Sequence, residues 1–141
     1  MKNTVAVLIV GGFLASLGVA VAAQATRSVN EGVYTVDQAK KGEATYKEQC
    51  AACHGDNLEG SGPMPPLAGK DFLANWQGKA VADVYDKTQT SMPATAPGSL
   101  SPEQAADVVA YMLSMSKYPA GGADLPAKSD DLKQITLDAP K

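Results

Sequence analysis

Cysteine and histidine are scarce in this chain, which has two cysteines and one histidine among 141 residues. All three lie within the run Cys50-Ala51-Ala52-Cys53-His54. A structural zinc site takes four nitrogen or sulfur ligands, and three ligands crowded into one helical turn do not supply them. A thioredoxin-type Cys-x-x-Cys needs a βαβ context, and the flanking sequence has no strand pattern. A disulfide between the two cysteines stays possible, but it leaves the histidine unexplained.

The spacing of these residues is the attachment signature of a c-type haem. In Cys-x-x-Cys-His the two thiols bind the haem vinyl groups and the histidine binds the iron. We therefore predict one covalent haem c, held by Cys50 and Cys53 as thioethers, with His54 as an axial iron ligand. Most of the remaining sequence can then be interpreted as packing around a redox centre.

The first residues have the pattern of an export signal. Residues 1–3 form a short positive region, residues 4–21 are almost wholly apolar, and small residues at 20–23 supply a cleavage site. This pattern predicts a secretory signal peptide over residues 1–23 and a periplasmic location. The alternative is an uncleaved membrane anchor, which the glycines and alanines of the run disfavour. We expect contact with a membrane only if this segment is uncleaved.

Basic residues are not in excess. The formal charge is −3, and loss of Lys2 with the signal leaves −4 on about 118 residues, the size of one domain. Nucleic acid is therefore excluded as a partner, since binding it needs a basic face. We divide the rest into an N-terminal extension (24–34), a domain (35–126) and a C-terminal tail (127–141). Both ends are expected to be poorly anchored.

Helical periodicity is clear at both ends of the predicted domain. The first helix begins at a capping box formed by Thr35 and Gln38, and its small and apolar positions recur at steps of three and four as far as the cysteines. Its end would present both thiols and His54. The last helix begins with Ser101-Pro102 and a capping-box glutamine at 104, and it ends at Tyr118-Pro119. Shorter helices are expected over 70–76 and 80–90, and loops over 55–69 and 91–100.

The iron needs a second axial ligand or an open position. Met112 belongs to the apolar stripe of the last helix, with Met115 on the same helix, and it fits the core. Met64 follows His54 by only ten residues, so the chain would have to wrap the haem edge very quickly. Met92 lies 38 residues downstream of the histidine, on a loop that can reach the opposite face. We therefore predict His54 and Met92 as axial ligands, the pair found in cytochromes c.

The order of these motifs resembles that of a class I c-type cytochrome. The stretch 91–101 is more specifically similar to the cytochrome c domains associated with quinoprotein alcohol dehydrogenases. The resemblance covers about residues 35–126, and it implies a compact all-α fold with three to five helices wrapped around one covalent haem. The segments that carry it are the motif at 50–54, Pro66-Leu67-Ala68-Gly69, Met92-Pro93 and Val109-Ala110-Tyr111-Met112.

The resemblance also implies how the helices meet. In that family the first and last helices cross at a small residue on one helix and an aromatic residue on the other. Gly42 and Tyr46, facing Tyr111, fit that crossing.

The resemblance also implies which residues form the haem pocket. In the family a proline carbonyl after the haem motif accepts a hydrogen bond from the ligand histidine, which orients the ring. Pro66 matches this proline best, with Pro63 and Pro65 as alternatives. The haem pocket is expected to include Pro66, Leu67 and Trp76, with an apolar wrap from Tyr85 and Val108.

These features predict an electron-transfer protein of a respiratory chain and no enzyme. It would carry one electron from a dehydrogenase, such as a quinoprotein alcohol dehydrogenase, to a cytochrome or oxidase acceptor. We expect a monomer with small, transient contacts around the haem edge. A fixed subunit of a dehydrogenase complex stays an alternative. An open-site haem enzyme would need a distal acid or base, for which no second histidine is available, and a gas-binding protein of this kind would carry the motif near its C-terminus.

Overall fold

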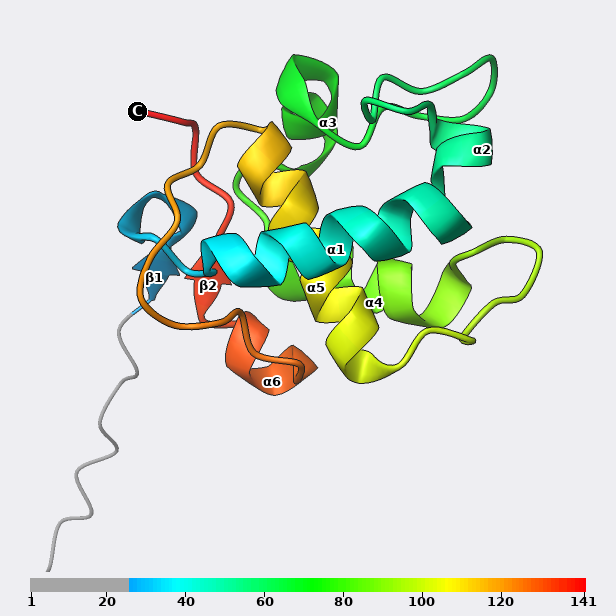
Figure 1. Ribbon diagram of the computed structural model, residues 1–141. Helices are drawn as coiled ribbons and strands as arrows, with labels where there is room; N and C mark the ends of the chain where they lie inside the picture. The colour runs from blue at the N-terminus through cyan, green and yellow to red at the C-terminus, as the bar shows by residue number, and fades with distance from the viewer. Residues whose placement is uncertain (1–25) are drawn as a thin grey trace, which may run out of the picture.

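The computed structural model describes residues 26–141, and helices account for most of its regular structure (Figure 1). The predicted signal peptide, residues 1–23, lies outside the described residues. Between residues 26 and 141 no helix is long and apolar enough to cross a membrane. The elements in chain order are β1 (Arg27–Ser28), the 3-10 helix η1 (Val29–Glu31), α1 (Val36–Gln49), α2 (Ala51–His54), α3 (Gly69–Trp76), α4 (Val81–Ser91), α5 (Pro102–Met115), α6 (Ser129–Leu132) and β2 (Ile135–Thr136).

The all-α prediction is confirmed, with some differences in detail. The described residues form six α-helices, more than the three to five that were predicted. One reason is that α6 was not expected. The other is that the first predicted helix breaks at Cys50, where φ is −126° and ψ is −34°. The capping box at Ser101 and Gln104 is present. The capping box at Thr35 is only half formed. Thr35 accepts from the Gln38 amide at 3.1 Å, but the Gln38 side chain bonds to the backbone of Leu125 instead.

The crossing of α1 and α5 is the main helix contact, and Figure 1 shows α1 lying across α5. Gly42 allows the close approach, because a Cβ atom at this position would lie 1.8 Å from the backbone oxygen of Asp107. One turn further on, the rings of Tyr46 and Tyr111 pack with centroids 5.5 Å apart. The three residues expected at the crossing therefore lie there.

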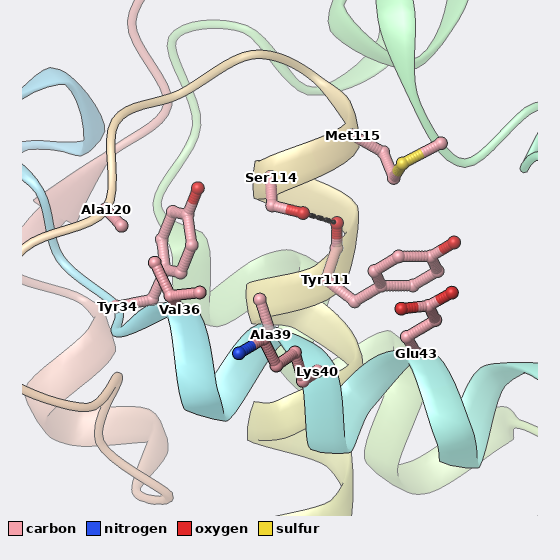
Figure 2. A pocket seen from close by; sticks show the side chains of 9 residues that line it. All are labelled: Tyr34, Val36, Ala39, Lys40, Glu43, Tyr111, Ser114, Met115 and Ala120. Atoms are coloured by element: carbon pink, nitrogen blue, oxygen red, sulfur yellow. Dashed lines mark hydrogen bonds between the residues drawn. The ribbon is translucent and has the colours of Figure 1, made fainter.

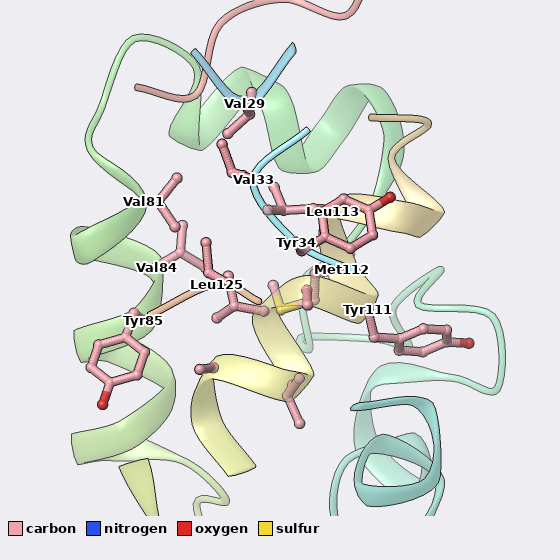
Figure 3. Packing of buried hydrophobic residues seen from close by; sticks show 14 of the residues in the cluster. Val29, Val33, Tyr34, Val81, Val84, Tyr85, Tyr111, Met112, Leu113 and Leu125 are labelled. Carbon is pink, nitrogen blue, oxygen red and sulfur yellow. The ribbon is translucent and has the colours of Figure 1, made fainter. Parts of the chain in front are cut away.

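The expectation of poorly anchored ends is wrong for the described residues. Val29, Leu132 and Leu137 are completely buried, and β1 pairs in parallel with β2. Figure 3 shows Val29 and Val33 in the same cluster as side chains of α4 and α5. The ends thus complete the core. A two-residue strand and isolated apolar residues have no periodicity that could have predicted this.

Every tyrosine of the chain is buried, with at most 7% of its surface exposed. Burial disfavours the charged phenolate and raises the pKa of each side chain above its ordinary value of 10. The five residues are Tyr34, Tyr46, Tyr85, Tyr111 and Tyr118.

This burial predicts a steep loss of stability in alkali. Because the pKa values are raised in the folded chain, the tyrosines of the unfolded chain ionise first as the pH rises through 10, so the free energy of unfolding falls. Each of these tyrosines adds at most about 1.4 kcal/mol per pH unit to this slope. Urea denaturation followed by circular dichroism between about pH 8 and pH 11 measures it. Tyr111→Phe should flatten the slope by roughly one fifth, since one of five groups is removed. A constant free energy over this range would contradict the prediction.

Candidate functional site

The predicted site residues meet at one cavity of about 330 Å³. Figure 1 shows that α2 and the loop after α4 lie at the same end of the molecule. The structure places all seven predicted residues in the lining of this cavity: Cys50, Cys53, His54, Pro66, Leu67, Trp76 and Met92.

The single turn of α2 presents the haem motif. The Cys50 amide still donates to the Tyr46 carbonyl at 2.8 Å, and the backbone then turns out of α1. The new turn is closed by the His54 amide, which donates to the Cys50 carbonyl at 2.9 Å. Gly55 ends it with a φ of +82°, which glycine adopts without strain. Local backbone bonds therefore bring the two cysteines and the histidine onto one short turn.

The imidazole of His54 is held in one orientation. Its Nδ1 lies 2.9 Å from the carbonyl oxygen of Pro65, and the residue is only 7% exposed. A carbonyl can only accept, so Nδ1 carries the proton and donates, which leaves the Nε2 lone pair free for a metal. Of the three prolines considered, the alternative Pro65 accepts this bond, and the preference for Pro66 is wrong. A tight turn that pairs Ser61 with Met64 immediately precedes Pro65, and both Pro65 and Pro66 contribute to the cavity wall.

The two thiols are unpaired and differ in exposure. Cys50 is half-buried and Cys53 is exposed. Burial raises the pKa of Cys50, and the neighbouring Cys53 adds to this shift. No disulfide joins them, so both sulfurs are available for thioether bonds.

Met92 enters the cavity from a different element. It is the C-terminal cap of α4, where its amide donates to the Thr88 carbonyl at 3.3 Å. Met64 also lines the cavity, but it is 39% exposed and immediately precedes the proline that holds His54. Met112 is buried on α5. Met92 stays the predicted second axial ligand.

Several residues of the cavity wall were not predicted from the sequence. Val84, Lys87 and Thr88 line the cavity at the three- and four-residue spacing of one helix face, a signal that was present in the sequence of α4. Tyr85, expected in the apolar wrap, is not among the lining residues. Its hydroxyl donates to the Ala127 carbonyl instead. The remaining unpredicted lining residues include Gln49, Asn75, Ala94 and Thr95.

This donor set fits a covalent haem c. Two free thiols, one imidazole with a fixed proton and one thioether line the same cavity, and the other walls are largely apolar. Cys50 and Cys53 would hold the macrocycle, and His54 and Met92 would bind its iron. The ring of Trp76 also lies under the Lys79 ammonium, 4.9 Å from the ring centroid.

A second, smaller pocket of about 290 Å³ lies between α1 and α5 (Figure 2). Its lining includes Tyr34, Val36 and Met115, and the Ser114 hydroxyl donates to the Tyr111 carbonyl at 3.0 Å. Its lining includes none of the predicted haem-binding residues.

Comparisons with known proteins agree with this geometry. The chain is 42% identical over 80 residues, 51% of its length, to the thiosulfate dehydrogenase of Stutzerimonas stutzeri (strain A1501), of which it spans 25%. Its fold is similar to that of a chain in the crystal structure of the sulfane dehydrogenase SoxCD from Paracoccus pantotrophus. The TM-score is 0.57 and the identity 23%, over 91% of this chain and 67% of the other.

A family model covers the haem motif, the α1–α5 crossing and Met92 together. The model, described as "Cytochrome C oxidase, cbb3-type, subunit III", matches residues 37–112. A member of this family is expected to bind haem c covalently, and the donor set of the cavity fits that cofactor. The resemblance to class I cytochromes is thereby confirmed, and the chain belongs to the cytochrome c family of cbb3-type oxidase subunit III.

Proposed function

We propose that this protein is a periplasmic one-electron carrier with a single haem c that links a dehydrogenase to a downstream respiratory acceptor. The observation that carries the proposal is the cavity in which Cys50, Cys53, His54 and Met92 meet. The bound haem supplies an iron that gains or loses one electron. His54 and Met92 would both bind that iron, which would leave no position for a substrate, so carrying electrons is favoured over bond-making chemistry.

Residues around the cavity would set how readily the haem accepts and releases its electron. His54 is oriented by the Pro65 carbonyl, which limits rearrangement when the charge of the iron changes. As an iron ligand, the thioether of Met92 would favour the reduced state, and apolar wall residues such as Val108 would act in the same direction by excluding water. We therefore expect a potential above that of a bis-histidine haem.

The donor is proposed to be a dehydrogenase. Support comes from the names of the similar proteins, a thiosulfate dehydrogenase and a sulfane dehydrogenase, and from the resemblance of residues 91–101 to cytochromes that accompany alcohol dehydrogenases. Both kinds of donor release electrons that a one-electron carrier can collect. The donor's substrate is therefore either a small alcohol or a reduced sulfur compound.

Spectroscopy of the exported protein tests the carrier role. We expect one haem per chain in the pyridine haemochrome assay, a low-spin spectrum in both oxidation states, and no binding of carbon monoxide by the reduced protein at neutral pH. The protein alone should not oxidise thiosulfate or ethanol with ferricyanide as acceptor. A high-spin spectrum or ready carbon monoxide binding would contradict the proposal, because one ligand position of the iron would then be open.

A fixed subunit of a dehydrogenase complex is the second candidate. The chain spans only a quarter of the thiosulfate dehydrogenase that it matches, so the similar region there is joined to other parts. Gel filtration of a native extract, followed by haem staining, separates the two forms. A free carrier elutes at the size of a single small domain, whereas a subunit elutes with its dehydrogenase.

A further inference from the structure

Met92 is positioned from the α4 side. It caps α4, and its amide bonds back to Thr88 within that helix. In the part of the chain that the structure describes, the backbone bonds of the following loop run within the loop, from Ala96 to Pro93 and from Ser99 to Ala96. These loop bonds do not tie Met92 to another element, and the next residue, Pro93, is buried in the cavity wall. The backbone bond to Thr88 joins Met92 to α4, so whatever holds α4 in place also helps to hold Met92.

Helix α4 lies between the haem cavity and the C-terminal segment, defined as residues 127–137. Val84, Lys87 and Thr88 face the cavity. The neighbouring face carries Tyr85 and Asp86 and meets the C-terminal segment, whose helix α6 packs on α4.

Two side-chain hydrogen bonds join these surfaces. The Tyr85 hydroxyl donates to the Ala127 carbonyl at 3.1 Å, and the Ser129 hydroxyl donates to the Asp86 carboxylate at 2.9 Å. Leu132 lies completely buried beside them. The first part of the C-terminal segment is thus fixed to the middle of α4.

The other end of the segment is fixed just before α4 begins. The Leu137 amide donates to the Lys79 carbonyl at 2.9 Å, and the Gly78 amide donates to the Leu137 carbonyl at 2.7 Å. Leu137 is completely buried, and the neighbouring β2 pairs with β1. The segment therefore contacts α4 at two places, just before its first residue and along the face that carries Tyr85 and Asp86.

We propose that the C-terminal segment is a brace that holds α4 against the haem cavity and so limits how readily Met92 leaves the iron. This inference rests on the proposed function, because it takes Met92 as the axial ligand. Tyr85 and Ser129 are positioning residues in this role. They act on Met92 through the helix and do not touch the cofactor.

The rate at which imidazole displaces Met92 from the oxidised holoprotein tests the brace. At saturating imidazole this rate reports the opening of the methionine side, and the sulfur-to-iron absorption band follows it. Tyr85→Phe and Ser129→Ala each remove one hydrogen bond between the segment and α4. Each should raise the displacement rate about two- to tenfold, the range that corresponds to one hydrogen bond.

Tyr34→Phe is the matched control. Tyr34 is also a buried tyrosine whose hydroxyl donates to a backbone carbonyl, but its acceptor is Tyr118, beyond the end of α5. This variant should lower the urea midpoint to a similar degree and leave the displacement rate within about twofold of wild type. The brace is disproved if Tyr34→Phe accelerates displacement as much as Tyr85→Phe and Ser129→Ala do, or if neither of those two variants changes the rate.

The same spectra separate failure of the brace from failure of the proposed function. If the wild type shows the sulfur-to-iron band and Tyr34→Phe has the same displacement rate as Tyr85→Phe and Ser129→Ala, only the brace is wrong. If the wild type lacks the band, Met92 is not the ligand, and both the proposed closed iron site and the brace are wrong.

Discussion

Replacement of Met92 by alanine is expected to abolish the sulfur-to-iron absorption band and to open the iron. The variant should bind carbon monoxide readily when reduced, which the wild type should not do. Its reduction potential should fall by a sizeable part of the roughly 0.8 V range over which axial ligands set haem potentials. The reason is that the thioether favours the reduced iron, and the water or hydroxide that can replace it does not. Optical spectra and a redox titration measure both effects.

Met64→Ala is the control for this experiment. Met64 lines the same cavity but is 39% exposed and lies on the loop that holds His54. Its loss should leave the band and the potential close to those of the wild type. A band that survives in Met92→Ala and disappears in Met64→Ala would reverse the assignment of the second ligand.

Gly42→Ala is expected to have the second large effect, on stability. Alanine at a mid-helix position would ordinarily be about 1 kcal/mol better than glycine. Here its Cβ would lie 1.8 Å from the backbone oxygen of Asp107. That atom cannot rotate away, so α1 and α5 must separate and the contact between Tyr46 and Tyr111 must loosen. We expect a net loss of about 3 kcal/mol or more, which corresponds to a fall of roughly 10 °C or more in Tm.

Gly122→Ala separates the clash from a general effect of the added methyl group. A Cβ atom at Gly122 would have no heavy atom within 4 Å, so the change in stability should stay within about 0.5 kcal/mol. Thermal unfolding of the two oxidised holoproteins by circular dichroism gives the comparison. Equal midpoints would show that the two helices can move apart at little cost.

The parts of the fold that could be predicted from the sequence are those with a local signal. The haem motif and the cap at Ser101 each depend on a few neighbouring residues, and both appear in the structure. The crossing at Gly42, which the family resemblance implied, is present as well. The break at Cys50 was missed because apolar spacing continues through it.

Other features depend on contacts between distant residues, which spacing does not reveal. The Gln38 side chain leaves its capping role to bond with Leu125, 87 residues away. Pro65 and Pro66 differ in whether their carbonyl points at His54, and this depends on how the whole loop turns. The burial of Leu132 and Leu137 likewise depends on surfaces that exist only once α4 is in place.

The pairing of β1 with β2 has a consequence for how the domain can be built into larger proteins. The Asn30 side chain donates to the Ala139 carbonyl at 2.9 Å, so the first and last described stretches of chain lie side by side. Figure 1 places β1 and β2 at the end of the molecule away from α2 and the loop that follows α4. A polypeptide joined at either stretch, or at both, therefore leaves the haem end uncovered. The domain is suited to use as an insertable electron-transfer module, tethered at one end and exchanging electrons at the other.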